Sequence, residues 1–183
     1  MRAKAELLPG FPLTQRTPGF KEIGLAVIVG EAGDLSNYAT VRKLWRRLGL
    51  GMAPGHEAHA YSTWGRMKGA LSSEEWTRAG YSPKRLGQIY GVVTVPLLMM
   101  KAKNKYGEIY AARRAHTAVT HPTGTAAECR ADPNRWTPGH SHMDAQRVMT
   151  KALISDLWSE WRGSASKLKA NACLAPAELI AAE

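Results

Sequence analysis

Long apolar runs, a secretory leader and paired cysteines are all missing from this sequence of 183 residues. A membrane-spanning helix needs about 18 consecutive apolar residues, and no such run occurs. The N-terminal MRAKAELLPGF has no apolar stretch followed by a cleavage site, as a signal peptide would have. The two cysteines, Cys129 and Cys173, lie far apart and do not indicate a disulfide framework. These absences predict a soluble, cytoplasmic protein with no membrane partner.

Carboxylates are scarce near the N-terminus. Before Asp34 the sequence contains only Glu6, Glu22 and Glu31. Cleavage of DNA with two metal ions requires several carboxylates that converge on one site. We therefore expect no DNA-cutting metal site and no cofactor in this chain.

Histidine and cysteine spacings give no metal motif either. His56 and His59 follow a Pro-Gly pair that predicts a loop, where we expect solvated histidines. Cys129, His140 and His142 form a loose set whose spacing matches no zinc pattern. The sequence therefore assigns no metal ligands.

Acidic residues are fewer than basic residues, and the basic excess is concentrated in one segment of the chain. The net charge is +10. From Arg42 to Arg114 there are 14 Lys and Arg against 4 Asp and Glu, whereas the rest of the chain has 11 of each. Charge gathered in this way favours a polyanionic partner, because contacts between basic side chains and phosphates release counterions. An anionic membrane is the competing partner, but no long amphipathic stretch joins this charge to an exposed apolar face.

What the sequence does contain is a turn followed by two predicted helices, within residues 17–50. Residues 18–20, Pro-Gly-Phe, are a turn signal, since proline presets its φ and glycine accepts a positive φ. Residues 23–29 are mostly apolar and predict a helix that is buried on most sides. Gly30 and Gly33 are expected to mark its end.

A basic amphipathic helix follows, with Thr40 as its expected N-cap and Gly49 as its expected C-terminal glycine. One face is an apolar stripe at helical spacing, formed by Val41, Leu44, Trp45 and Leu48. The other face is basic and is formed by Arg42, Lys43, Arg46 and Arg47. Such a face can be merely solvated, but the preceding turn and helix favour a nucleic-acid-binding unit.

The middle of the chain predicts further helices after a loop-rich basic stretch at residues 51–82. An apolar period from Lys84 to Lys101 indicates a helix kinked at Pro96, with a strand at residues 92–95 as the alternative. A helix is predicted from residue 104 to 120, with its tyrosines packed inward.

The C-terminal part predicts a linker, a helix and a tail. Residues 121–139 are rich in Pro, Gly and Thr and predict a linker or long loop. A helix is predicted at 140–162, opened by a capping-box variant at residues 141–144 and closed by Gly163. Its apolar stripe predicts a face for docking onto the main domain, with an oligomer seam as the alternative; the stripe comprises Met149, Leu153, Leu157 and Trp161. Residues 163–183 are expected to be a disordered tail.

The expected fold is therefore mostly α: a helix-hairpin-helix unit, additional helices and a docked C-terminal helix. Residues 1–16 form a short lead, and residues 17–120 form the basic domain.

Several blocks occur in the same order as in a known family. They are residues 18–50, residues 80–85 with the following helix, Asn104-Lys105-Tyr106-Gly107 with Tyr110 and the Arg113-Arg114 pair, and residues 142–147 through 156–162. Together they resemble one branch of the Piv-like (DEDD, RuvC-like) bacterial insertion-sequence transposases, over about residues 17–162. The resemblance implies a C-terminal helix-hairpin-helix domain that binds DNA during transposition.

The resemblance also implies roles for individual residues. The hairpin at Gly19 would bind duplex backbone, and Lys21, where many members have a second glycine, can add a phosphate contact. The family has a nucleophilic serine after the basic helix, and the nearest position here is Ser62, although the usual serine–glycine pair is not reproduced. Ser72 and Ser73 also lie nearby, and the alternative is that Ser62 is an ordinary loop serine. Arg66 and Lys68 would supply its cationic surroundings. The predicted DNA-binding residues are Gly19, Phe20, Lys21, Arg42, Lys43, Arg46, Arg47, Arg66, Lys68, Lys84 and Arg85.

The implied partners are double-stranded DNA, a guide RNA, a RuvC-like nuclease domain or subunit, and a second copy of the chain. In the family an acidic nuclease domain precedes the hairpin, and residues 1–16 are too few to hold it. The implied Mg²⁺ would belong to that domain, so we expect no activity from this chain alone. One alternative is a non-catalytic remnant or stand-alone DNA-binding protein. Another is a protein that binds single-stranded or structured RNA.

Overall fold

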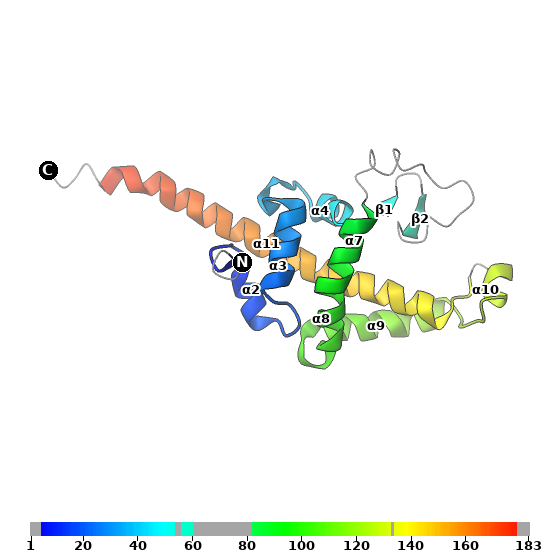
Figure 1. The fold of residues 1–183 in the computed structure, drawn as a ribbon. Coiled ribbons are helices and arrows are strands. Elements are labelled where there is room, and N and C mark those ends of the chain that lie inside the picture. The colour runs from blue at the N-terminus through cyan, green and yellow to red at the C-terminus, as the bar shows by residue number, and fades with distance from the viewer. Residues whose placement is uncertain (1–4, 54–55, 61–81, 133, 179–183) are drawn as a thin grey trace.

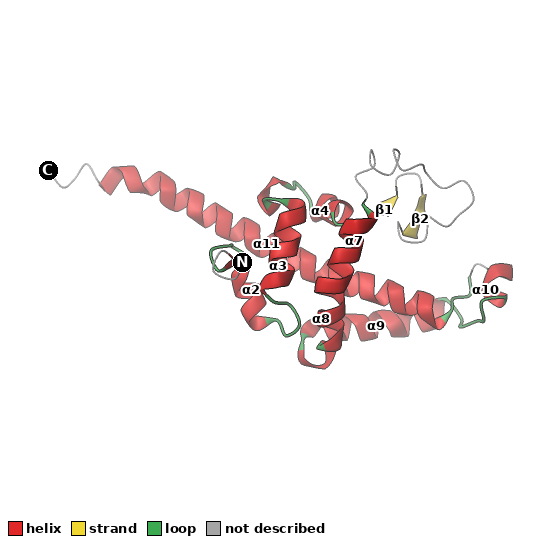
Figure 2. Cartoon of the chain, viewed as in Figure 1, coloured by secondary structure: helices red, strands yellow, loops and turns green. Residues whose placement is uncertain are grey.

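The computed structural model describes residues 5–53, 56–60, 82–132 and 134–178 (Figure 1). The fold is mostly α-helical, as the sequence predicts (Figure 2). In chain order the elements are α2 (Phe11–Arg16), α3 (Glu22–Ala32), the 3-10 turn η1 (Leu35–Asn37), α4 (Val41–Arg47), β1 (Met52–Ala53), β2 (His56–Ala60), α7 (Pro83–Ile89), the π-helical turn η2 (Tyr90–Thr94), α8 (Val95–Met99), the 3-10 turn η3 (Lys101–Lys103), α9 (Lys105–Thr120), α10 (Glu128–Ala131) and α11 (Pro138–Glu178).

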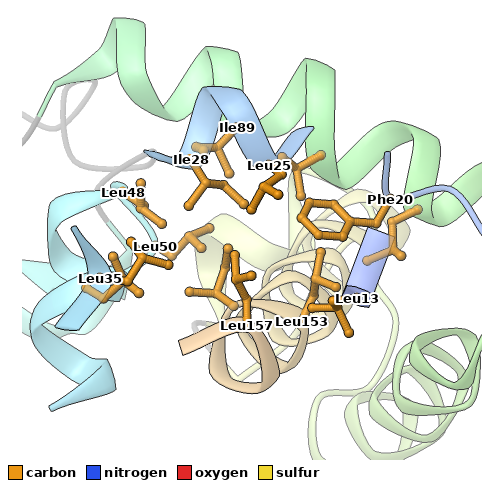
Figure 3. Packing of buried hydrophobic residues seen from close by; sticks show 14 of the residues in the cluster. Leu13, Phe20, Leu25, Ile28, Leu35, Leu48, Leu50, Ile89, Leu153 and Leu157 are labelled. Atoms are coloured by element: carbon orange, nitrogen blue, oxygen red, sulfur yellow. The ribbon is translucent and has the colours of Figure 1, made fainter. Parts of the chain in front are cut away.

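The core forms where α3 and α7 lie side by side and cross α11 (Figure 1). A continuous cluster of buried side chains joins these helices to α2 and α4 (Figure 3). Leu25 and Ile28 come from α3, Ile89 from α7, and Leu153 and Leu157 from α11, and all five are fully buried. Burial of such a side chain contributes about 1.5–3 kcal/mol. One core is therefore shared by α2, α3, α4, α7 and the C-terminal helix α11.

The predicted helices α3 and α4 are confirmed, and Gly33 and Gly49 follow their ends as expected. Gly30 was also expected to mark the end of α3 but lies within it, and the burial of α3 on most sides is wrong, because Ile23 is 65% exposed. Gly33 has a φ of 76°, and its N–H donates to the carbonyl of Val29 over 2.7 Å. Gly49 has a φ of 79° and follows α4. Both values lie in the left-handed region that glycine adopts without steric cost. Thr40 precedes α4 as predicted, but its side chain makes no capping hydrogen bond.

The helix predicted to run through Pro96 is also confirmed, and the strand alternative for residues 92–95 is wrong. α7, η2 and α8 follow one another directly, and the turn before Pro96 is π-helical. There the N–H of Val95 donates to the carbonyl of Tyr90, five residues earlier. Proline has no N–H to donate, so a shift of the hydrogen-bond ladder by one residue accommodates it within a helical segment.

α9 and α11 pack along each other and form an arm that carries α10 near its end (Figure 1). Tyr106 of α9 is 1% exposed, and its hydroxyl donates to Asp156 Oδ2 over 2.8 Å. The predicted apolar stripe of α11 is buried at Met149, Leu153, Leu157 and Trp161. The inward packing of the tyrosine and the docking face of α11 are therefore confirmed.

Three boundaries differ from the prediction. α11 begins at Pro138, where Thr137 Oγ1 accepts a hydrogen bond from the N–H of His140, rather than at the 141–144 capping box. It also continues past Gly163 to Glu178, because one glycine costs a helix only about 1 kcal/mol and the alanine-rich sequence beyond it favours helix. Finally, the loop-rich stretch after residue 50 contains the antiparallel pair β1–β2.

Candidate nucleic-acid interface

The basic face of α4 is exposed, as the helical period predicts. Leu44 and Leu48 are fully buried and fix the orientation of the helix on the core. Arg42, Lys43, Arg46 and Arg47 are all exposed on the opposite side. The side chains of Arg42 and Lys43 make no hydrogen bond or ion pair within the described part of the chain. They are therefore available to an anionic partner.

The end of α4 is fastened to α3 and α7 by arginine. Arg47 Nε donates to the main-chain carbonyl of Glu31 over 3.0 Å. Arg85 Nη1 donates to the main-chain carbonyl of Arg47 over 2.8 Å, and Arg85 Nε pairs with Glu31 Oε2 at 3.0 Å. The Arg85 side chain is only 13% exposed. Arg85 thus positions the basic helix, and its predicted role as a DNA contact stays a prediction.

Lys84 lies at the start of α7, next to Arg85, and its side chain is exposed. The hydrogen bond from Arg85 to Arg47 therefore brings Lys84 close to the C-terminal end of α4. We refer to these five exposed basic residues as the α4 cluster: Arg42, Lys43, Arg46, Arg47 and Lys84.

The other edge of α4 meets α11 through Trp45. The indole Nε1 donates to the carbonyl of Lys151 over 3.2 Å, and Lys151 Nζ lies 5.1 Å from the centre of the Trp45 ring. Burial, and then the positive charge of Arg147, lower the pKa of Lys151 from 10.5 to about 8. Sequence reasoning missed Lys151, because its apolar surroundings come from a helix more than a hundred residues earlier.

The hairpin turn is not the open phosphate site that the resemblance implies. Gly19 has a φ of 89°, and a Cβ built there would lie 2.5 Å from the carbonyl oxygen of Pro96. Phe20 is fully buried, so its predicted contact with DNA is wrong and its side chain belongs to the core. Lys21 alone of these three is exposed.

The predicted catalytic residues are not among those that the structure describes. Ser62, Arg66 and Lys68 fall outside the described residues. Among the residues that are described, no group of three or more His, Cys, Asp or Glu side chains is placed to hold a metal ion. Over the same residues, no helix combines the length and the apolar character needed to cross a membrane.

Polar side chains also hold α9 against α11. Asp144 is 6% exposed and accepts from Arg113 Nε at 2.5 Å and from Arg147 Nη2 at 2.7 Å. His142 lies between the hydroxyl of Tyr110, at 2.6 Å, and Gln146 Nε2, at 2.8 Å. Burial, and then the charges of nearby basic residues, lower the pKa of His142. These contacts hold α9 against α11, and helical spacing alone does not predict them.

Comparison with known proteins adds no relative: no protein-family model matches the chain, and neither does any curated protein or solved structure. The transposase resemblance and the DNA-binding role therefore stay predictions, supported by the sequence blocks and by the exposed α4 cluster.

Proposed function

We propose that this chain binds duplex DNA in DNA transposition, as the C-terminal, DNA-gripping part of an insertion-sequence transposase in the bacterial cytoplasm. The observation that carries the proposal is the α4 cluster. Four of its five exposed basic side chains lie on one short helix whose opposite face is fixed in the core, and the fifth, Lys84, lies at the start of α7. Phosphate contacts of this kind dominate the affinity of proteins for DNA and do not depend on sequence.

In this proposal the chain binds DNA, and the metal ions needed for cleavage are bound by a separate domain or subunit. A RuvC-like nuclease domain or subunit would provide the converging carboxylates and bind Mg²⁺. Ser62 remains the candidate nucleophile of the family resemblance. A guide RNA and a second copy of the chain remain candidate partners on the same basis.

The role of the α4 cluster in DNA binding can be tested by removing the charges of Arg42 and Lys43, whose side chains make no hydrogen bond or ion pair within the described part of the chain. Arg42→Gln with Lys43→Gln should weaken duplex binding about equally for all sequences and reduce the magnitude of the log–log salt slope by about 1.8, since each phosphate contact contributes about 0.9. Arg46→Ala with Arg47→Ala should act in the same direction, but Arg47 also holds α3. Fluorescence anisotropy at several salt concentrations measures the slope.

Circular dichroism and urea unfolding would show that the variants are folded. An unchanged slope in folded Arg42→Gln, Lys43→Gln protein would remove α4 from the interface. A preference for RNA over duplex DNA in the unaltered chain would favour the RNA-binding alternative instead.

A further inference from the structure

The hairpin turn is docked on the corner between α8 and α9. Asn104 Nδ2 donates to the carbonyl of Pro18 over 3.0 Å, between residues 86 positions apart in the sequence. The same amide also donates to the carbonyls of Leu97 and Met100, at 3.1 and 2.9 Å. Gly19 packs directly on the backbone of α8. The residues just after the turn are therefore held beside η3.

This docking places three lysines at one corner of the molecule. Lys21 follows the turn, and Lys101 and Lys103 belong to η3; all three are exposed. In the described part of the chain, the side chains of Lys21 and Lys103 make no ion pair or hydrogen bond, and Lys101 Nζ lies 5.3 Å from the centre of the Tyr110 ring. Lys105 differs, because it pairs with Asp156 at 2.7 Å. We call Lys21, Lys101 and Lys103 the corner cluster.

The corner cluster and the α4 cluster lie at opposite ends of α3. Lys21 is the N-cap of α3, whereas Arg47 donates to the carbonyl of Glu31 in its last turn. With 11 residues at about 1.5 Å each, α3 is about 16 Å long. The major groove of B-DNA is about 12 Å wide. The two clusters are thus spaced to reach the two phosphate backbones that border one groove.

The surface between the clusters includes three exposed glycines, beside the exposed side chains of Ile23 and Tyr90. Gly30 of α3, Gly87 of α7 and Gly91 of η2 are exposed, and a Cβ built on any of them would meet nothing within 4 Å. The carboxylate of Glu31 is paired with Arg85 and so adds no unbalanced negative charge there. A polyanion can approach the backbone closely at these three glycines.

We propose that the corner cluster is a second phosphate-binding surface, and that the chain straddles one groove of duplex DNA with the α4 cluster on one backbone and the corner cluster on the other. This inference rests on the proposed binding of duplex DNA. It assigns to Lys101 and Lys103 a contact that the sequence blocks do not suggest.

The test compares three double variants of the full chain on one labelled duplex. Lys101→Gln with Lys103→Gln should reduce the magnitude of the log–log salt slope by about 1.8, as should Arg42→Gln with Lys43→Gln, and the two losses should add. Lys167→Gln with Lys169→Gln removes the same charge from the far end of α11, which extends away from α3 and α7 (Figure 1), and should leave the slope unchanged.

Phosphate-ethylation interference then locates the contacts. We expect two sets of interfering phosphates, one on each strand across a groove, with one set lost in the α4 variant and the other in the corner variant. Normal binding with an unchanged slope in the corner variant, or interference on a single strand, would overturn the two-backbone arrangement while leaving DNA binding intact. Absence of duplex binding by the unaltered chain would instead overturn the proposed function, and this inference with it.

Discussion

The side-chain amide of Asn104 donates to the carbonyl of Pro18, which ties the N-terminal hairpin turn to the start of α9. The same side chain accepts from the N–H of Gly107 over 3.1 Å and so caps α9. Asn104 therefore holds both the start of α9 and the turn that precedes α3. The distance between the α4 cluster and the corner cluster depends on this connection.

Replacing Asn104 should therefore lower the free energy of unfolding by more than the loss of an ordinary helix cap does. Asn104→Ala removes the cap of α9 and leaves the Pro18 carbonyl without its partner, so we expect a loss of about 2 kcal/mol in the free energy of unfolding. Urea denaturation followed by circular dichroism measures it. Asn37→Ala, at an exposed position, is the matched control and should change stability by less than about 0.5 kcal/mol. Equal effects of the two substitutions would contradict the role of Asn104.

Two glycines should respond to alanine in opposite directions. Gly19→Ala forces a side chain into a positive φ and against the Pro96 carbonyl, and should destabilise the fold by about 2 kcal/mol or more. Gly30 lies inside α3 with open space around it, so Gly30→Ala should stabilise the fold by up to about 1 kcal/mol. Thermal unfolding of both variants measures these two changes in stability. A stabilising Gly19→Ala would show that the turn does not dock on α8.

The buried carboxylate of Asp144 should be needed to hold the arm together. Asp144→Ala leaves Arg113 and Arg147 without their shared partner, and we expect a loss of about 3 kcal/mol. The exposed pair between Arg135 and Asp132 is the comparison, and Asp132→Asn should cost less than about 1 kcal/mol. Similar costs for the two substitutions, measured in urea, would contradict the burial of Asp144.

Lys151 should make stability depend on pH in alkaline solution. Its folded pKa of about 8 lies below its ordinary 10.5, so between these values the unfolded state binds more protons and stability rises with pH. The penalty for the buried charge is complete below about pH 8 and is relieved as the pH rises to about 10.5. Lys151→Met keeps the apolar stem over Trp45 but has no titrating group. Urea unfolding from pH 7 to 10.5 should show a steeper rise for the unaltered chain than for the variant; parallel curves would refute this assignment.

Local sequence pattern was enough to predict the parts of the site that depend on one helix. The period of Leu44 and Leu48 orients α4, so the exposure of Arg42 and Lys43 follows from spacing alone. The helical period from Lys84 to Lys101 likewise predicts the helical run of α7, η2 and α8.

Features that depend on distant parts of the chain could not be predicted in this way. Phe20 and Arg85 were both predicted to bind DNA. Phe20 is part of the hydrophobic core, which distant helices complete, and Arg85 is paired with Glu31 of α3. The corner cluster likewise exists only because Asn104 brings η3 to the turn. Gly163 was expected to end α11, but the favourable sequence on both sides carries the helix through it.

The most direct measurement is the binding of the purified chain to labelled duplex DNA, single-stranded DNA and RNA of equal length, by fluorescence anisotropy at several salt concentrations. The account predicts that duplex DNA binds most tightly, with a steep negative log–log salt slope that falls in magnitude by about 1.8 in the Arg42→Gln, Lys43→Gln variant. Weak binding to all three nucleic acids would contradict it, because the α4 cluster would then be only a solvated basic surface.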